Sequence, residues 1–320
     1  MPDSVVPSMK TVLVLGATGF IGSRVVAALD GSPAYRPVAA SRRSGLKVDA
    51  TNPNSMRAAL HNIDCVINCI AGNDRTMIRT TQVLCDAARD FPPRRIVHLS
   101  SMAVYGAAIG EVREDHEPVA PVSGYGRAKI DCERIVLNYV NDGGDAVILR
   151  PTCVFGPGST QWTTRLARLL KARRIGDLGN GGDGCCNLAF IDDVVATIVA
   201  ALDAPGISGK AFNISSSREL TWNEFLVAFA KALGATPVRR IPPRMLRIET
   251  KLLAPIRRIA ALAIRSPATE AITPSLAALW RQDIRIDCAA AEAALALPRT
   301  SADRMIAATL RHQMREPVLS

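Results

Sequence analysis

The chain has 320 residues, of which 48% are hydrophobic and 21% are charged, so it can form a large folded core. No apolar run approaches the ~18 residues that cross a bilayer, and residues 1–10 do not resemble a signal peptide, so we expect a cytoplasmic protein without stable membrane insertion. The net charge of +10 with 4% aromatic residues and no nucleic-acid motif favours an anionic small-molecule ligand over nucleic acid. The eight cysteines lack metal-ligand and disulfide spacing, so no metal site is expected.

The first motif in the chain is an apolar strand at 11–15 followed by three glycines and a helical pattern at 23–29. The first glycine suits a tight turn, the second lets a diphosphate approach the backbone, and the third lets the helix lie close to the sheet. The positive end of the helix then faces the phosphates. The motif predicts a dinucleotide site with these cofactor contacts: Gly16, Thr18, Gly19, Phe20, Ile21 and Gly22.

The following segments alternate between strands and helices. After a disordered lead at 1–8, we expect further strands at 37–41, 47–50, 64–70 and 146–150, another that begins at 95, and helices between them. This rhythm predicts an α/β fold, a Rossmann-type doubly wound parallel sheet with a smaller C-terminal substrate-binding domain. We expect the dinucleotide-binding domain at 9–155 and a mainly substrate-binding region at 156–320, from which 186–215 return to the sheet.

The end of the second strand bears on the choice of cofactor. It carries Ser41, Arg42 and Arg43 and no carboxylate. A carboxylate there would bind the ribose 2′-hydroxyl of NAD, whereas a guanidinium binds the 2′-phosphate of NADP. The sequence therefore favours NADP over NAD, and the alternative is that the two arginines only decorate a solvent-exposed loop. Ala71, after the fourth strand, is expected to pass close under the cofactor.

A candidate catalytic group follows the fifth strand. Ser101 stands at the end of that strand, and Tyr125 and Lys129 follow at i, i+4 spacing on one face of a predicted helix. A tyrosine titrates near ~10, and a neighbouring ammonium favours its phenolate and brings its pKa toward the working range. Ser101 could hydrogen-bond the same substrate oxygen while hydride passes to or from a nicotinamide. His98 is interpreted as a core or edge histidine.

The chain resembles the extended short-chain dehydrogenase/reductases, the NAD(P)-dependent epimerase/dehydratase family. The segments that carry the resemblance are GATGFIG, HLSSMAVYG, YGRAK, LRPTCVFGPG and FIDDVV, and it covers about residues 9–312, weakly after 233. It implies that Ser101, Tyr125 and Lys129 are the catalytic triad and that Lys129 also holds the nicotinamide ribose. It further implies adenine contact by Asp49, cofactor contact by Pro151, and a possible homodimer through the helices at 75–89 and 125–140.

Two departures from the family pattern bear on the reaction. Dehydratases of this family carry an acid pair directly after the catalytic hydroxyl, and this chain has Met102 and Ala103 there, which disfavours dehydration. Cys153 occupies the position where nucleotide-sugar epimerases usually have a substrate-binding asparagine. An arginine near the closing strand grips the pyrophosphate in nucleotide-sugar relatives, so the candidate substrate contacts are Met102, Cys153, Arg281 and Arg285.

The C-terminal half contains four further signals. The glycine-rich run 176–184 is interpreted as a lid or turn over the substrate. Asp192 and Asp193 are expected to cap a helix at 194–202, and Thr221 with Glu224 has capping-box spacing. The basic, apolar segment 239–265 is expected to pack within the smaller domain, the alternatives being a membrane surface or a substrate wall.

These observations leave three functional hypotheses. The favoured one is an NAD(P)-dependent oxidoreductase that interconverts a carbonyl and an alcohol on a small-molecule substrate, with NADP preferred. The alternative is a nucleotide-sugar epimerase with tightly bound NAD(P). A third is a catalytically silent NADP-binding sensor, against which the intact Ser, Tyr and Lys count.

Overall fold

A sheet of parallel strands forms the centre of the molecule, and its order is β10-β7-β5-β4-β1-β2-β3. The computed structural model describes residues 9–42, 45–117, 119, 123–216, 220–253, 256–257 and 271–315, so the expected lead at 1–8 lies outside the described residues. The seven strands are β1 (Lys10–Leu15), β2 (Tyr35–Ser41), β3 (Leu46–Lys47), β4 (Cys65–Asn68), β5 (Arg95–Leu99), β7 (Asp145–Pro151) and β10 (Ala211–Ile214). The predicted α/β fold with a doubly wound parallel sheet is confirmed.

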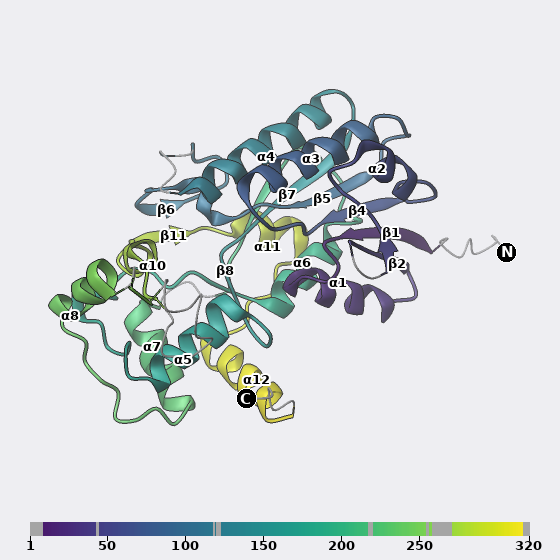
Figure 1. Ribbon diagram of the computed structural model, residues 1–320. Coiled ribbons are helices and arrows are strands. Elements are labelled where there is room, and N and C mark those ends of the chain that lie inside the picture. The colour runs from purple at the N-terminus through teal and green to yellow at the C-terminus, as the bar shows by residue number, and fades with distance from the viewer. Residues whose placement is uncertain are drawn as a thin grey trace.

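Helices cover both faces of this sheet (Figure 1). One face carries α2, α3 and α4, and the other carries α1 and α6, with α3 packed along α4 and α1 against α6. Their bounds are α1 (Phe20–Asp30), α2 (Pro53–Ala59), α3 (Asp74–Ala88), α4 (Gly124–Asn141) and α6 (Ile191–Ala200). Because all strands are parallel, the loops that follow their carboxyl ends meet at one edge, and that edge is where a ligand is expected.

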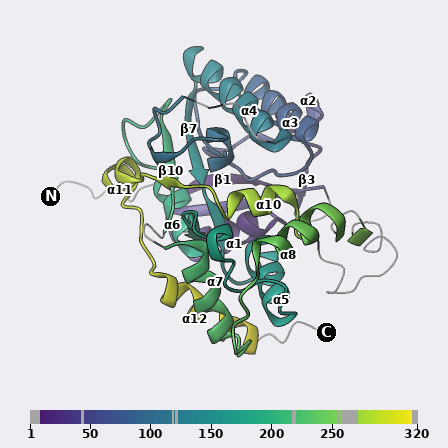
Figure 2. The ribbon, with the colours of Figure 1, turned by 90° about the vertical axis from the view of Figure 1, so that its left-hand side faces the viewer.

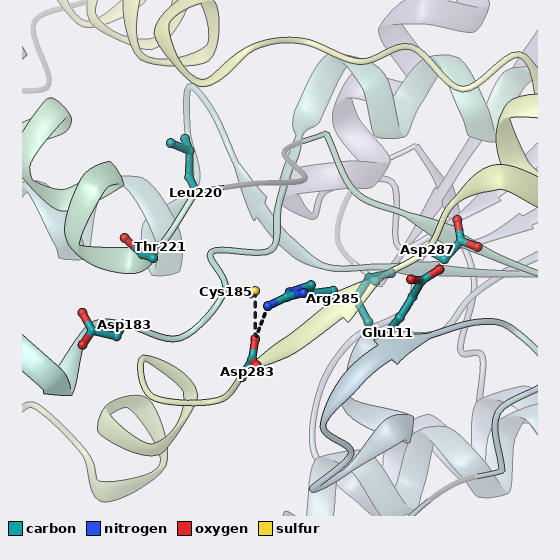
Figure 3. Close-up of a pocket in the computed structure, with 9 residues that line it drawn as sticks. Glu111, Asp183, Cys185, Leu220, Thr221, Asp283, Arg285 and Asp287 are labelled. Atoms are coloured by element: carbon teal, nitrogen blue, oxygen red, sulfur yellow. Dashed lines mark hydrogen bonds and ion pairs between the residues drawn. The ribbon is translucent and has the colours of Figure 1, made fainter.

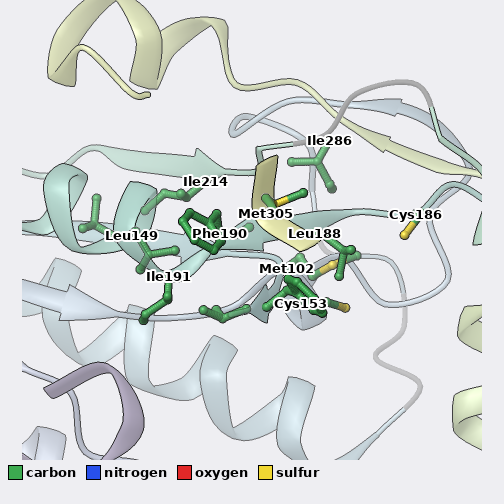
Figure 4. Packing of buried hydrophobic residues seen from close by; sticks show 14 of the residues in the cluster. Met102, Leu149, Cys153, Cys186, Leu188, Phe190, Ile191, Ile214, Ile286 and Met305 are labelled. Atoms are coloured by element: carbon green, nitrogen blue, oxygen red, sulfur yellow. The ribbon is translucent and has the colours of Figure 1, made fainter. Parts of the chain in front are cut away.

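The core lies on both sides of the sheet. Successive side chains of a strand point to opposite faces, so Val12 and Val97 enter one buried cluster while Leu13 and Ile96 enter the other. The first cluster is the larger, because it continues beneath the segments that follow β7. Figure 4 shows part of it, in which apolar side chains of the sheet strands and of the later strand–helix unit pack together.

The segments after β7, together with the segment 102–112 that follows β5, build a second layer on one side of the sheet (Figures 1 and 2). Two small parallel sheets, β8 with β9 and β6 with β11, connect this layer to the central one. Its elements are η1 (Met102–Tyr105), β6 (Gly110–Val112), β8 (Cys153–Phe155), η2 (Thr160–Thr164), α5 (Arg165–Lys171), η3 (Gly179–Gly181), β9 (Leu188–Phe190), α7 (Trp222–Ala232), α8 (Pro243–Ile248), η4 (Glu249–Leu253), α10 (Pro274–Leu279), β11 (Ile284–Ile286), α11 (Ala289–Leu295) and α12 (Ala302–Arg315). None of the helices in the described ranges has the length and apolar character needed to span a bilayer.

The glycine-rich run 176–184 is anchored on both sides. The Asn223 amide donates to the Gly179 carbonyl over 2.8 Å and accepts from the Leu178 N–H over 2.8 Å. The Ile241 N–H donates to the Asp177 carbonyl over 2.7 Å. These bonds anchor the run as a turn within the second layer, and its predicted role as a lid or turn over the substrate stays a prediction.

The basic segment that begins at 239 packs partly as expected. Leu246 is buried, and Glu249 forms a buried ion pair with Arg174 at 3.1 Å. These contacts fix 239–253 within the smaller domain, and residues 254–255 and 258–265 of the segment lie outside the described residues.

The expected caps of α6 and α7 differ in outcome. The capping box of Thr221 and Glu224 at α7 is confirmed. The expectation that Asp192 and Asp193 cap α6 is wrong, because α6 begins at Ile191 after Phe190, has no side-chain cap and contains both aspartates in its first turn. Asp193 is instead buried, and its carboxylate accepts hydrogen bonds from the Ser216 hydroxyl and from the N–H and hydroxyl of Thr300. This carboxylate therefore ties α6 to the C-terminal segment.

We predict that Asp193→Ala lowers the free energy of unfolding by about 3 kcal/mol, because it leaves buried donors of Ser216 and Thr300 without an acceptor. Urea unfolding measures the change. The neighbouring Asp192→Ala is the matched control and should cost less than about 1 kcal/mol, because Asp192 is exposed. Equal losses of unfolding free energy in the two variants would show that the hydrogen bonds of Asp193 to Ser216 and Thr300 do not stabilise the fold.

Candidate active site

The turn between β1 and α1 is a cradle that only glycine can form. Gly16 has a φ of +77°, and a Cβ there would lie 2.9 Å from the Cys69 carbonyl. A Cβ on Gly22 would lie 2.3 Å from the Gly16 carbonyl oxygen. Gly19 is the N-cap of α1 and provides no side-chain cap, so the N–H groups of the first turn remain open to an anion. This geometry fits the diphosphate of a dinucleotide.

The other predicted cofactor contacts lie at the carboxyl ends of neighbouring strands. Thr18 is exposed in the turn after β1, and Ala71 is exposed in the segment after β4. Pro151 is buried as the last residue of β7. Together with Phe20 and Ile21 at the start of α1, these residues belong to elements that end or begin at one edge of the sheet.

At the ribose end, Ser41 closes β2 and Arg42 is exposed directly after it. The Asp49 carboxylate accepts hydrogen bonds from the Thr51 N–H and hydroxyl, at 3.0 and 2.7 Å. These bonds lower the pKa of Asp49, and the nearby charge of Arg42 adds to the effect. Arg43 lies outside the described residues.

The fold brings the three candidate catalytic residues together. Ser101 follows β5 and caps η1, while Tyr125 and Lys129 belong to the first turns of α4. The Ser101 side chain faces Tyr125 closely enough to lower the pKa of the phenol. The Lys129 ammonium lies 5.8 Å from the centre of the Tyr125 ring and donates to the Leu99 carbonyl over 2.6 Å. The group therefore links the end of β5 to the start of α4.

The electrostatics of Tyr125 differ from the expectation. Burial raises its pKa above the ordinary value of a tyrosine, and the interaction with Ser101 only partly opposes this. Lys129 is 3% exposed and its own pKa is lowered by burial. The expected lowering of the Tyr125 pKa by the ammonium is thus wrong for the ligand-free chain, because loss of water around the phenolate dominates. The Tyr125 residue as a whole is 41% exposed.

A buried polar pair lies behind these residues. His98 Nδ1 accepts from the Asn68 amide over 3.2 Å, and Asn68 Oδ1 accepts from the Ile70 N–H over 3.2 Å. This pattern assigns the His98 proton to Nε2, for which the described residues contain no partner. Burial, with the charge of Lys129, lowers the pKa of His98 to about 3. His98 is the expected core histidine, and its link to the chain after β4 was not evident from the sequence.

Two of the predicted substrate contacts are buried apolar residues. Met102 is 8% exposed and Cys153 is 5% exposed, and both belong to the larger core. Figure 4 shows them beside Leu188 of β9. That dehydration is disfavoured, a prediction that rests on Met102 and Ala103, stays a prediction.

A pocket of about 480 Å³ opens between the small sheet β6–β11 and the segment before β9 (Figure 3). Arg285 lines it, whereas Arg281 is exposed and is not among its lining residues. The Asp283 carboxylate lies 3.5 Å from the Arg285 guanidinium and 3.4 Å from the Cys185 sulfur. The sequence analysis assigned no functional role to Cys185. The lining residues are Glu111, Asp183, Cys185, Leu220, Thr221, Asp283, Arg285, Ile286 and Asp287.

The pocket lining carries four carboxylates and one guanidinium, so its surface is acidic. Over the described ranges, no three His, Cys, Asp or Glu side chains gather in a way that could hold a metal ion.

The pKa of His98 yields a prediction for the pH dependence of stability. The folded chain resists protonation of His98 until about pH 3, whereas the unfolded chain takes up this proton below about 6.5, so stability falls as the pH drops through this window. Between pH 7 and pH 5 we expect a loss of about 2 kcal/mol from this group. Urea unfolding at both pH values should show a smaller loss for His98→Asn. The same substitution at the exposed His61 is the control, and an unchanged loss in His98→Asn would contradict the assignment.

Comparisons with known proteins agree with this geometry. The chain is 26% identical over 258 residues to a UDP-glucose 4-epimerase of Vibrio cholerae, covering 73% of this chain and 78% of the relative. It is 29% identical over 246 residues to a dTDP-4-keto-6-deoxy-D-glucose reductase of Streptomyces niveus, covering 72% and 82%. The structure of UDP-glucuronic acid 4-epimerase from Bacillus cereus, solved with UDP-glucuronic acid and NAD, has a TM-score of 0.73 at 22% identity and covers 95% of this chain and 99% of that one.

The family comparison covers most of the chain, and it includes the glycine cradle as well as all three members of the Ser-Tyr-Lys group. The matched residues are 12–215. The protein is therefore an enzyme that belongs to the NAD dependent epimerase/dehydratase family.

Proposed function

We propose that this enzyme oxidises and then re-reduces a secondary alcohol on a nucleotide-linked sugar, so that the net reaction is epimerisation without net consumption of cofactor. The observation that carries the proposal is that the fold brings Ser101, Tyr125 and Lys129 together, at the sheet edge to which the glycine cradle also leads. The names of the relatives support the substrate class, since they include a UDP-glucose 4-epimerase and a dTDP-keto-sugar reductase.

The chain offers a place for each part of the cofactor. The absence of a Cβ at Gly16 and Gly22 and the open first turn of α1 suit the diphosphate. We infer that Tyr125 and Lys129 hold the nicotinamide ribose, and that Asp49 contacts the adenine. A bound nicotinamide supplies the group that accepts and returns the hydride.

The protein residues then have distinct roles. Tyr125 exchanges a proton with the substrate oxygen, and its raised pKa means that it begins as the protonated acid, the form that a ketone requires. Ser101 donates a second hydrogen bond to the same oxygen and fixes its position. Lys129, whose ammonium lies 5.8 Å from the centre of the Tyr125 ring, holds the nicotinamide ribose and joins the start of α4 to the Leu99 carbonyl at the end of β5.

The second candidate is a reductase of a ketone that bears no diphosphate. The acidic pocket favours it, because four carboxylates would repel a pyrophosphate and the one lining arginine, Arg285, already faces Asp283. The apolar Met102 and Cys153 also offer no hydrogen bonds to sugar hydroxyls. In this case reduced cofactor would be consumed in proportion to product.

The absence of a carboxylate at the end of β2, together with Arg42, leads us to propose a preference for NADP. We predict that Arg42→Asp weakens NADPH binding about tenfold or more and leaves NADH binding within about twofold, because the substitution replaces a phosphate partner by a repelling charge. Titration of nicotinamide fluorescence measures both affinities. Arg36→Asp, at the opposite end of β2, is the control of equal charge change. A tighter affinity for NADH than NADPH in the parent chain would sink the preference.

The decisive experiment is incubation of the enzyme with catalytic NAD(P) and a panel of UDP- and dTDP-hexoses, followed by chromatography of the products. We expect a C4-epimer to appear while the absorbance of reduced nicotinamide stays constant. Tyr125→Phe should lower kcat by about a hundredfold or more with cofactor binding retained, because it removes the proton donor. Stoichiometric oxidation of NADPH with simple ketones, and no reaction of the sugar nucleotides, would replace the epimerase by the second candidate.

A further inference from the structure

A buried ion pair stands directly behind the candidate catalytic residues. Glu133 of α4 and Arg150 of β7 are 7% and 9% exposed. The guanidinium binds the carboxylate with two parallel bonds, Nε to Oε1 at 3.0 Å and the terminal nitrogen to Oε2 at 2.8 Å. Glu133 follows Lys129 by one helical turn, so the pair and the ammonium lie on the same face of α4.

The pair extends into a network that contacts the other catalytic element. The Ser100 hydroxyl donates to Glu133, and Ser100 is the residue before Ser101. On its other side Arg150 donates to the Tyr105 hydroxyl over 2.9 Å, and Tyr105 closes the η1 turn that Ser101 caps. Both ends of the short segment 100–105 are therefore held by one ion pair.

Further bonds fix the pair itself. Arg150 donates to the Glu114 carbonyl over 2.9 Å, and the Tyr105 hydroxyl donates to Asn213 over 2.6 Å. The Asn213 amide in turn donates to the Asp287 carbonyl over 2.9 Å. The Arg150 guanidinium thus joins β7 to Glu133, Tyr105 and Glu114. Both oxygens of the Glu133 carboxylate accept hydrogen bonds.

Stability alone does not account for such a pair. Removing two charges from water is costly, and apolar residues of similar volume in the same place are often as stable or more stable. What apolar residues cannot provide is direction, because only a hydrogen-bonded carboxylate fixes the Ser100 hydroxyl and the guanidinium at set angles to α4. The pair joins the element that carries Ser101 to the helix that carries Tyr125 and Lys129.

We propose that Glu133 and Arg150 are positioning residues that hold Ser101 in register with Tyr125 and Lys129. The inference rests on the proposed function, in which these three residues act on one substrate oxygen. Without the pair, segment 100–105 remains folded but Ser101 loses its fixed distance to Tyr125. Displacements of this kind slow a reaction without weakening the binding of the cofactor.

The test is the double variant Glu133→Leu/Arg150→Met, which removes the ion pair without leaving a buried charge unpaired. We expect the thermal midpoint and the NADH affinity to stay close to those of the parent, while kcat on the sugar-nucleotide panel falls about tenfold or more with little change in KM. The matched control is Arg89→Met/Asp142→Leu, which removes an ion pair at the far end of α4 and should change none of these quantities.

A second variant guards against loss of folding. Ser100→Ala deletes only the hydroxyl that binds Glu133 and should lower kcat by about threefold or more while the protein stays folded. If both folded variants retain the parent kcat, or if NADH affinity falls as much as kcat, the positioning role is wrong.

A readout without substrate separates this inference from the proposed function. Ionisation of Tyr125 is followed by its ultraviolet absorbance as the pH is raised. The signal of Tyr125 is the absorbance of each variant minus that of the same variant with the added substitution Tyr125→Phe. The groups that face Tyr125 are Ser101, Lys129 and Cys132, and the interaction with Ser101 is the one that lowers its pKa. Loss of register should shift the ionisation to higher pH. If the Tyr125 ionisation shifts in the variants but the parent enzyme converts no sugar nucleotide, the positioning role is supported and the proposed substrate class is wrong. If the ionisation does not shift and the variants turn over sugar nucleotides normally, the substrate class is supported and the positioning role is wrong.

Discussion

Several charged side chains lie inside this protein beside the central sheet, and each must be matched by a partner from another element because water is excluded. Lys129 donates to the carbonyl of Leu99, and Glu133 binds Arg150. These contacts join α4 to β5 and β7 along the edge where the candidate site lies. The requirement to pair buried charged groups with partners therefore also arranges the elements that carry the candidate catalytic residues.

The same burial governs the chemistry. Tyr125 begins its helix at the sheet edge, where loss of water raises its pKa and the interaction with Ser101 lowers it again. A raised pKa keeps Tyr125 protonated, as the donor to a ketone must be, whereas a lowered pKa favours the phenolate that accepts the proton of an alcohol. An enzyme that both oxidises and reduces its substrate has to pass between these states. The balance between burial of Tyr125 and its interaction with Ser101 is thus the physical property on which the proposed reaction depends.

Substrate choice depends on regions outside this shared framework. The relatives with sugar-nucleotide names match the chain over about three quarters of its length, and the matched family region ends at residue 215. Beyond it lie Asp283 and Arg285, which meet Cys185 of the matched region in an acidic pocket. Met102 and Cys153, within the matched region, are buried apolar residues. A diphosphate and an uncharged ketone make opposite demands on such surfaces. Arg285, one of the predicted substrate contacts, lines the acidic pocket, whereas Ser101, Tyr125 and Lys129 do not.

The sequence by itself determined the features that depend on neighbours along the chain. The glycine turn, the alternation of strands and helices, the capping box at Thr221 and the i, i+4 spacing of Tyr125 and Lys129 are local patterns with local causes. They sufficed to predict the parallel sheet and the family. Only the tertiary structure decided how Asp193 is used, because its partner Thr300 lies more than a hundred residues away. It likewise decided the rise of the Tyr125 pKa, the bond of His98 to Asn68 and the Glu133–Arg150 pair, since desolvation and long-range hydrogen bonds arise only when distant segments pack together.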